Sequence, residues 1–148
     1  MLYVKRQAFT MIEVVFVIVV LGILAAIAIP RLAATRDDAQ IAKGRSDVAA
    51  IRAAIVSERQ GRLLQGSSSY IPTLDDGVTG DGVELFDGNA TNRLLQYPII
   101  SRNANGHWTK NANGSYNYKV MNTDVVFDYN VTGGTFKCSG TYCSDLTQ

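Results

Sequence analysis

The sequence lacks the residue patterns from which most enzyme active sites are built. Its 148 residues contain one histidine and two cysteines, with no glycine-rich phosphate loop, no H-E-x-x-H and no G-x-S-x-G. No nucleophile–base pair can be nominated, so an enzyme is not expected.

The chain has fourteen Lys and Arg against thirteen Asp and Glu. This balance leaves no excess of positive charge of the kind that marks a nucleic-acid-binding protein. The length allows one modest core.

Charge is absent from a long stretch near the N-terminus. Residues 14–29 are all apolar or glycine, and residues 9–12 extend this stretch on the other side of Glu13. About 20 such residues are enough to cross a bilayer. Lys5 and Arg6 precede the stretch and no acid lies before Glu13. The positive-inside rule therefore predicts a cytoplasmic N-terminus and an exported remainder.

Glu13 distinguishes three interpretations of this segment. A cleaved signal peptide would use the A-x-A pattern of Ala26 and Ala28 as its cleavage site, but it would not carry a carboxylate at the start of its apolar region. A plain anchor would tolerate Glu13 near the interface. The cost of inserting a charged side chain, about 2.5–3.5 kcal/mol, applies at the bilayer centre and is lower near the edge. The third interpretation gives Glu13 a function, which requires a cationic partner. No Lys or Arg lies between residues 9 and 29.

A cut between Ala8 and Phe9 would create such a partner. The new α-amino group would lie four residues from Glu13, about 6 Å along a helix. Between two parallel chains that are offset along their axes, the amine of one could meet the carboxylate of the next. In a medium of low dielectric constant this pairing is strong and would set the register of a helical assembly.

The segment resembles a known export signal. Residues 8–32 read AFTMIEVVFVIVVLGILAAIAIPRL: a cleavage residue, Phe, a polar residue, two apolar residues, Glu, and an apolar helix containing Pro. This is similar to the class III signal of type IV pilins and of type II secretion pseudopilins. The resemblance implies that prepilin peptidase removes a leader, residues 1–8, that Phe9 is N-methylated, and that mature chains assemble into a filament. The family usually has glycine where this chain has Ala8, so less efficient processing is expected.

One long helix is predicted from Phe9 to about Gln60. Residues 9–30 would form its transmembrane and assembly half, and residues 31–62 an amphipathic half. Gly22 and Pro30 are its weak points, with a kink expected rather than an end. The apolar stripe of the second half has helical spacing: Ala34, Ile41, Gly44, Val48, Ile51 and Ile55. The opposite face is expected to be charged and solvated, and carries Arg36, Asp37, Lys43, Arg45, Asp47, Arg52 and Arg59.

Residues 63–148 are predicted to form an exported loop region and an antiparallel sheet. Alternating segments at residues 115–121, 125–131 and 134–138 predict three strands of a three- or four-stranded meander, with connections at 122–124 and at Gly133-Gly134. The sheet would cover the apolar stripe of the helix. The fold class is therefore α+β, and the resemblance implies a type IV pilin-like fold. A disulfide between Cys138 and Cys143 is favoured over two unlinked thiols because this region is expected to be exported.

Two segments raise binding questions. Residues 75–87 contain five acids that suggest calcium on a flexible loop, although their spacing does not match an EF-hand and a solvated loop is the alternative. His107 and Trp108 lie in a polar, turn-rich stretch. They indicate either a binding surface or one buried indole, and a lone histidine does not predict a metal site.

Three N-x-[ST] sequences occur after the helix, at Asn89, Asn113 and Asn130. At Asn89 and Asn130 an Asp precedes the asparagine by two residues, which is the form that bacterial N-glycosylation prefers. Such sequences also arise by chance in a chain rich in Asn and Thr, so glycosylation is a hypothesis at Asn89 and Asn130.

Taken with the resemblance, these features predict a pseudopilin that polymerises through its N-terminal helix into a periplasm-spanning filament of a type II secretion system. The alternatives are a subunit of a type IV pilus or of a DNA-uptake (competence) machine, or a minor tip subunit that binds a substrate. Glu13 favours a general subunit, because a tip subunit has no neighbour above it.

Implied partners are further copies, minor pilin-like subunits, the prepilin peptidase and N-methyltransferase, and an inner-membrane assembly platform. Nucleic acid is a partner only in DNA uptake. The implied location is the bacterial inner membrane, crossed once, with the C-terminal domain in the periplasm.

Overall fold

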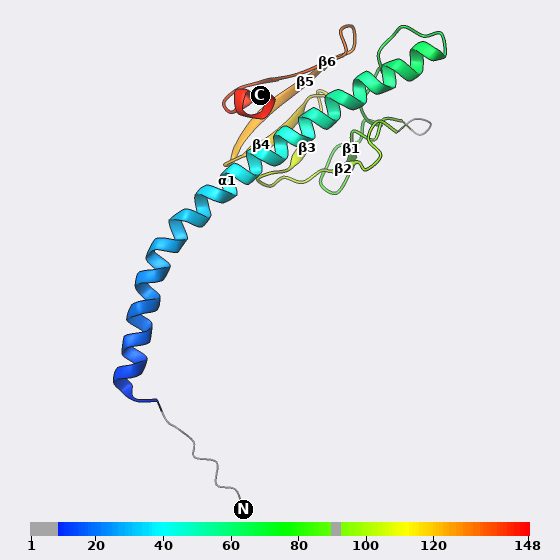
Figure 1. The fold of residues 1–148 in the computed structure, drawn as a ribbon. Coiled ribbons are helices and arrows are strands. Elements are labelled where there is room, and N and C mark those ends of the chain that lie inside the picture. Colours follow the sequence, from blue (N-terminus) through cyan, green and yellow to red (C-terminus); the bar gives the residue numbers. More distant parts are fainter. Residues whose placement is uncertain (1–8, 90–92) are drawn as a thin grey trace, which may run out of the picture. The chain divides into compact units, whose positions relative to one another are not determined.

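The computed structural model describes residues 9–89 and 93–148, except for the side chains of residues 30–34. A long helix, α1 (Met11–Leu64), is followed by short strands and a final helix, α2 (Cys143–Thr147) (Figure 1). The chain divides into two compact units, Met1–Arg36 and Asp37–Gln148, which are described separately below. One long helix followed by antiparallel strands confirms the α+β class.

The first unit contains the apolar half of α1. Met11–Ile29 has a mean hydropathy of 3.1 and none of it is buried within the protein, so by length and composition it could cross a membrane. The helical backbone continues through Gly22 and Pro30. The prediction that the helix continues past Pro30 is therefore confirmed. The predicted kink at this position stays a prediction.

The C-terminal end of α1 lies four residues beyond the predicted one. Gly66 has a φ of 85°, a left-handed conformation that glycine adopts without a steric penalty. Its N–H donates to the carbonyl of Leu63 at 3.0 Å, and the Ser67 N–H donates to the carbonyl of Arg62 at 2.9 Å. These two bonds form a Schellman motif, which satisfies carbonyl groups at the end of the helix.

Two antiparallel sheets follow. The larger is a four-stranded meander in chain order: β3 (Trp108–Lys110), β4 (Tyr116–Val120), β5 (Thr123–Asn130) and β6 (Thr135–Ser139). The smaller pairs β1 (Glu84–Leu85) with β2 (Ile99–Ile100). The three predicted strands and the meander are confirmed. The sequence did not show β1, β2 and β3 because strands of two or three residues are too short to display an alternating pattern.

The core lies between α1 and the larger sheet. Val48, Ile51 and Ile55 of the helix are buried, as are Tyr118 and Phe127 of β4 and β5. The predicted stripe is thus confirmed from Ile41 to Ile55; the side chain of Ala34 lies outside the described residues.

Gly44 marks the closest approach of the helix to the sheet. A Cβ at this position would lie 2.3 Å from Cε1 of Tyr118 and 2.6 Å from Cδ2 of Leu146. Any larger residue would therefore push the sheet or α2 away from the helix. The Tyr118 hydroxyl donates to the carbonyl of Gln40 at 2.6 Å, which fixes this approach.

The β4–β5 turn occurs one residue earlier than predicted. Met121 and Asn122 have φ values of 47° and 63°, and Val120 pairs with Thr123 across the turn. Two positive φ angles are the geometry of a type I′ hairpin. Asn favours this conformation and Met does not, so the sequence pattern did not reveal it. The Oε1 of Gln40 compensates by accepting a hydrogen bond from the Met121 N–H at 3.2 Å.

The charged side chains of α1 form the predicted solvated face only in part, because Arg36, Lys43 and Arg45 are exposed but Asp37, Asp47, Arg52 and Arg59 are half-buried. Arg52 donates two hydrogen bonds to the carbonyl of Phe136, at 3.0 and 3.1 Å. Lys43 donates to the carbonyl of Gly106 at 2.7 Å, and Arg59 donates to the Tyr70 hydroxyl at 2.8 Å. These side chains leave the helix along its flanks and bond to the rest of the domain. The prediction is wrong for Arg52 and Arg59, because long side chains at the edge of an apolar stripe can reach across it.

The predicted disulfide between Cys138 and Cys143 is present, with Cα atoms 5.6 Å apart. It joins the end of β6 to the first residue of α2, which the sequence did not predict. Leu146 of α2 is fully buried. Arg45 of α1 donates two hydrogen bonds to the carbonyl of Asp145, at 2.8 and 3.0 Å. The C-terminal segment is thus held on α1 by one apolar and one polar contact.

Candidate assembly site at the start of the long helix

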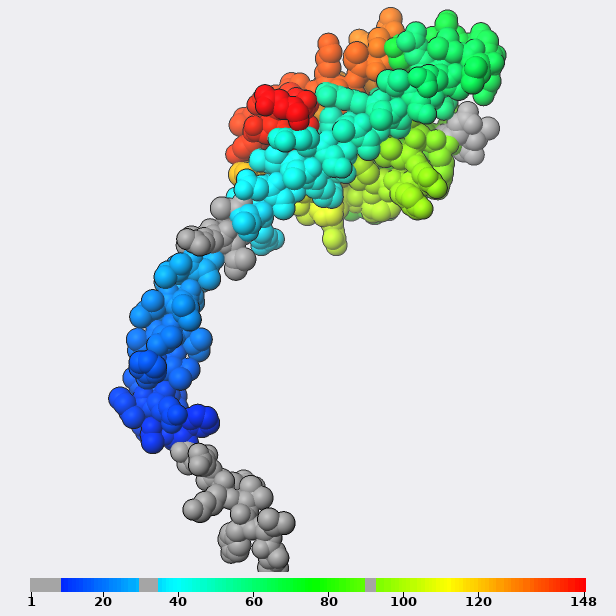
Figure 2. Space-filling model, viewed as in Figure 1, coloured from blue at the N-terminus to red at the C-terminus, as the bar shows by residue number. Residues whose placement is uncertain are grey.

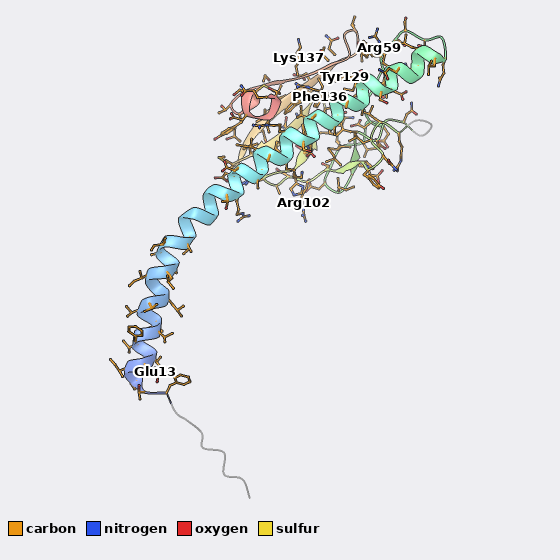
Figure 3. The ribbon with its side chains drawn as sticks, in the orientation of Figure 1. Glu13, Arg59, Arg102, Tyr129, Phe136 and Lys137 are labelled. Carbon is orange, nitrogen blue, oxygen red and sulfur yellow. A yellow bond between two sulfur atoms is a disulfide. The ribbon has the colours of Figure 1, made fainter. Side chains whose placement is uncertain are left out.

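The first turn of α1 contains a reciprocal pair of hydrogen bonds. The N–H of Glu13 donates to Oγ1 of Thr10 at 3.3 Å, and the N–H of Thr10 donates to Oε2 of Glu13 at 3.4 Å. This arrangement is a capping box, in which the residue before the helix and the third helical residue each satisfy the other's free N–H. Glu13 therefore has a local structural role in the isolated chain, at the helix end labelled in Figure 3.

This role was not among the sequence-based predictions. The signal was available, since T-x-x-E before an apolar run is the pattern of a capping box, and residues 10–13 read TMIE. A carboxylate in the first turn also interacts favourably with the positive end of the helix dipole. Both effects lower the free energy of placing Glu13 at the edge of the apolar segment.

The surroundings of Glu13 are apolar and open. Phe9 is 79% exposed, and together with Glu13, Val14, Val17 and Ile18 it lines a hollow of about 240 Å³. Apart from the carboxylate, the side chains that line it are hydrocarbon. Such a hollow suits an apolar side chain that brings a positive charge to its rim.

The structure places the predicted residues of this site as follows. Phe9 and Glu13 lie at the rim of the same hollow. Ala8, Lys5 and Arg6 lie outside the described residues. Cleavage at Ala8–Phe9, methylation of Phe9 and an ion pair of Glu13 with a neighbouring chain remain predictions.

The acidic residues of the 75–87 segment have separate partners. Asp75 forms an ion pair with Lys110 and accepts a hydrogen bond from the Tyr116 hydroxyl at 2.7 Å. Asp81 accepts from the Asn103 N–H at 2.9 Å, and Glu84 lies 3.4 Å from the guanidinium of Arg93. Within residues 9–89 and 93–148 there is no group of three His, Cys, Asp or Glu side chains that could hold a metal. The described residues thus give no support to the calcium hypothesis.

Asp87 is the exception within this segment. Its Oδ1 is buried without a hydrogen-bond partner among the described residues. Burial raises the pKa of its carboxyl group, and the negative charge of Asp76 raises the pKa further. Asp87 therefore opposes folding when it is ionised.

Trp108 is buried and does not form a binding surface. Its indole is 0% exposed, and its Nε1 donates to Oδ2 of Asp47 at 3.0 Å. Neighbouring His107 is half-buried. Its burial lowers the pKa of the imidazole, and the charge of Lys43 contributes in the same direction. Of the two interpretations of this stretch, the buried indole is correct.

The comparisons with known proteins cover only part of the chain. The family described as the prokaryotic N-terminal methylation motif matches residues 4–29. The type II secretion system core protein G of Pseudomonas aeruginosa is 39% identical over 51 residues, which are 34% of this chain and 36% of that protein. Over these matched residues the chain is similar to prepilin-like proteins, the type IV pilins and pseudopilins whose signal residues 8–32 resemble. The matched segment spans little more than a third of that relative's length. No solved structure matches this chain.

The methylation motif and the candidate membrane span overlap in the sequence. The methylation motif ends at residue 29, where the candidate membrane span Met11–Ile29 also ends. The motif therefore contains the whole candidate span together with residues 4–10 before it.

Proposed function

We propose that the chain is a pseudopilin, cleaved before Phe9 and polymerised through its N-terminal helix into a periplasmic filament of a type II secretion system. The observation that carries the proposal is Glu13, a carboxylate beside Phe9 at the start of an exposed apolar helix that matches the methylation motif. The name of the relative in Pseudomonas aeruginosa favours secretion over pili or DNA uptake.

The ion pair between subunits would form as follows. Cleavage at Ala8–Phe9 leaves a positively charged amine at the end of a segment that has no other cation before residue 30. In the membrane such an amine needs a carboxylate, and Glu13 of a neighbouring copy is the acid of this segment. Pairing of each amine with the Glu13 of the next copy would generate a helical array with one fixed offset. Other copies, minor pilin-like subunits, the prepilin peptidase and an inner-membrane platform are the proposed partners.

A second surface supports polymerisation. From Ser46 to Leu64, every exposed side chain of α1 is uncharged. Six of these residues repeat at spacings of three and four along one face of the helix: Ser46, Ala49, Ala53, Val56, Gln60 and Leu63. Spacings of three and four produce a seam that can pack against another helix, as in coiled coils. Figure 2 shows this part of α1 uncovered along the surface of the domain.

The charges that could have occupied this seam are bonded within the domain. Arg52, Arg59 and Arg62 donate to groups of β6 or of the segment after the helix. Asp47 accepts from Trp108, and Glu58 lies 3.5 Å from Arg62. A solvent-facing helix normally carries charge on its outer face. We infer that the seam packs against a neighbouring subunit.

The first prediction concerns processing. The mature chain isolated from membranes should begin with N-methylated Phe9, because the motif directs cleavage there. Intact mass and N-terminal sequencing measure this directly. A chain that starts at Met1, or after Ala28 as for an ordinary signal peptide, would contradict the proposal. Ala8→Gly is expected to increase the processed fraction, since glycine is the usual residue of the family at this position.

The second prediction concerns the seam. Ala53→Glu should fold and insert normally but enter filaments at least about tenfold less, because burying an unpaired carboxylate costs more than about 1.4 kcal/mol. The measurement is the fraction of the variant that co-purifies with sheared filaments. Ala112→Glu is the matched control, since Ala112 is also exposed but lies in the turn between β3 and β4. Equal incorporation of the two variants would show that the seam is not an interface.

A further inference from the structure

We propose that Asn130 is a site of N-linked glycosylation, modified after the C-terminal domain is exported. Asn130 is the acceptor of the sequence N-V-T, and Asp128 precedes it by two residues. The proposal requires export of the domain, which is also part of the proposed function. It goes beyond that function because filament assembly does not require a glycan.

The structure presents this sequence at the end of a hairpin. Asn130 is the last residue of β5, and residues 131–134 form the turn to β6. The side chains of Asp128, Asn130, Val131 and Thr132 are all exposed. In Figure 1 the turn between β5 and β6 protrudes from the folded domain. A large enzyme can therefore reach the acceptor without penetrating the core.

The acceptor group itself is available. Oδ1 of Asn130 accepts a hydrogen bond from the Gly133 N–H at 3.0 Å. Its Nδ2, the atom to which a glycan is attached, makes no hydrogen bond with any described residue. The Thr132 hydroxyl, which a transferase must also recognise in the N-x-[ST] sequence, is in the same exposed turn.

The other two sequences differ from Asn130 in ways that the structure explains. Ser115, the hydroxyl residue of the sequence at Asn113, is 5% exposed and donates its hydroxyl to Oδ1 of Asn113 at 2.7 Å. This sequence is therefore closed in the folded domain, and it also has no acid two residues earlier. Asn89 is exposed, but its sequence runs into residues 90–92, which lie outside the described residues. Only the site at Asn130 is proposed.

The end of the hairpin beyond Tyr129 can leave the sheet at low cost. Tyr129 is partly buried against the core and its hydroxyl donates to the carbonyl of Ile71 at 2.8 Å, so this residue holds β5 in place. Residues 130–133 are all exposed, and opening them would break a few backbone hydrogen bonds but would expose little apolar surface. Segments of this kind lie at the low-stability end of a folded protein and open locally. A transferase could thus bend the acceptor sequence into its own site after the domain has folded.

The chemistry requires a lipid-diphosphate-linked oligosaccharide and an oligosaccharyltransferase on the outer side of the inner membrane. The Nδ2 of Asn130 attacks C1 of the first sugar, and a new C–N bond forms. The bond between C1 and the diphosphate oxygen breaks, and the lipid diphosphate leaves with its electron pair. The amide nitrogen loses one proton to a base of the enzyme. No oxidant or reductant takes part.

Peptide mass spectrometry of the chain from its native membranes tests the proposal. The expected result is a glycan on the peptide containing Asn130 and an unmodified peptide containing Asn113. Asp128→Asn expressed in the same cells should lose the glycan, whereas the conservative variant Asp128→Glu should retain it. Asn130→Gln is the matched control that removes the acceptor. Asp128 is exposed, so these variants are expected to fold, and thermal unfolding followed through Trp108 checks this.

Protease accessibility in spheroplasts is measured on the same samples to establish export. An exported chain that carries no glycan at Asn130 overturns the glycosylation proposal and leaves the proposed function intact. A chain whose C-terminal domain is not exported overturns both. Retention of the glycan in Asp128→Asn would overturn the role of the acid as part of the recognised sequence.

Discussion

Glu13→Ala is expected to leave insertion and cleavage intact but to reduce incorporation into filaments by at least about tenfold, because each 1.4 kcal/mol changes an equilibrium tenfold. In an assembly that contains this variant, the amine of a neighbouring chain would lie in the membrane without a carboxylate. Removing one partner of a buried ion pair costs about 3–5 kcal/mol. The measurement is the ratio of variant to wild-type chain in sheared filaments compared with the ratio in the membrane.

Two further variants separate the ion pair from the capping box. Glu13→Gln retains an oxygen that can accept from the Thr10 N–H but removes the charge, so it should fail almost as completely as alanine. Thr10→Val removes the hydroxyl that accepts from the Glu13 N–H and retains the carboxylate, so it should assemble nearly normally. If Glu13→Gln entered filaments as well as the wild type, helix capping would explain the residue and the ion pair would be excluded.

The second large effect is expected at Lys110. Its side chain is 9% exposed and pairs with Asp75, whose side chain is 1% exposed. Lys110→Met leaves that carboxylate buried with the Tyr116 hydroxyl and the Gly77 N–H as its remaining partners. We expect a loss of about 3–5 kcal/mol in the free energy of unfolding. Trp108, the single tryptophan, is fully buried, and its fluorescence in the detergent-solubilised chain reports the transition.

A control and a rescue accompany this variant. Lys137→Met changes the same residue type at an exposed position of β6 and should alter stability by less than about 0.5 kcal/mol. The double variant Asp75→Leu, Lys110→Met removes both charges and should recover much of the loss, since a buried ion pair can often be replaced by apolar residues without a large penalty. A loss below about 1 kcal/mol for Lys110→Met alone would show that the pair is solvated.

The sequence predicted those parts of the molecule in which one regular pattern extends over many residues. The apolar segment, the stripe from Ile41 to Ile55 and the strands β4, β5 and β6 all have such patterns, and the structure confirms them. Pairing of Cys138 with Cys143 followed from the expected export of the domain. Each of these predictions depends on residues that lie close together in the sequence, or on the presence of only two cysteines in the chain.

The missed features depend on contacts between residues far apart in the chain. Asp75 was placed in a candidate calcium loop, because nothing in its neighbourhood indicates that Lys110 lies beside it. Asp47 and Arg52 were assigned to a solvated face, although their partners are in β3 and β6. The capping box at Thr10 and Glu13 is different, because its T-x-x-E pattern is local and is visible in residues 10–13 of the sequence.

If the chain assembles as proposed, the capping box would affect how unassembled copies are held in the membrane. In the chain alone, Oε2 of Glu13 accepts a hydrogen bond from the Thr10 N–H and lies near the positive end of the helix dipole. Polymerisation would then be an exchange reaction, in which an incoming amine displaces a weak intramolecular donor. A reservoir of unassembled copies would thus be stabilised without being trapped, because a charged amine outcompetes a neutral N–H for the same oxygen. Filament growth and disassembly would both proceed through that substitution.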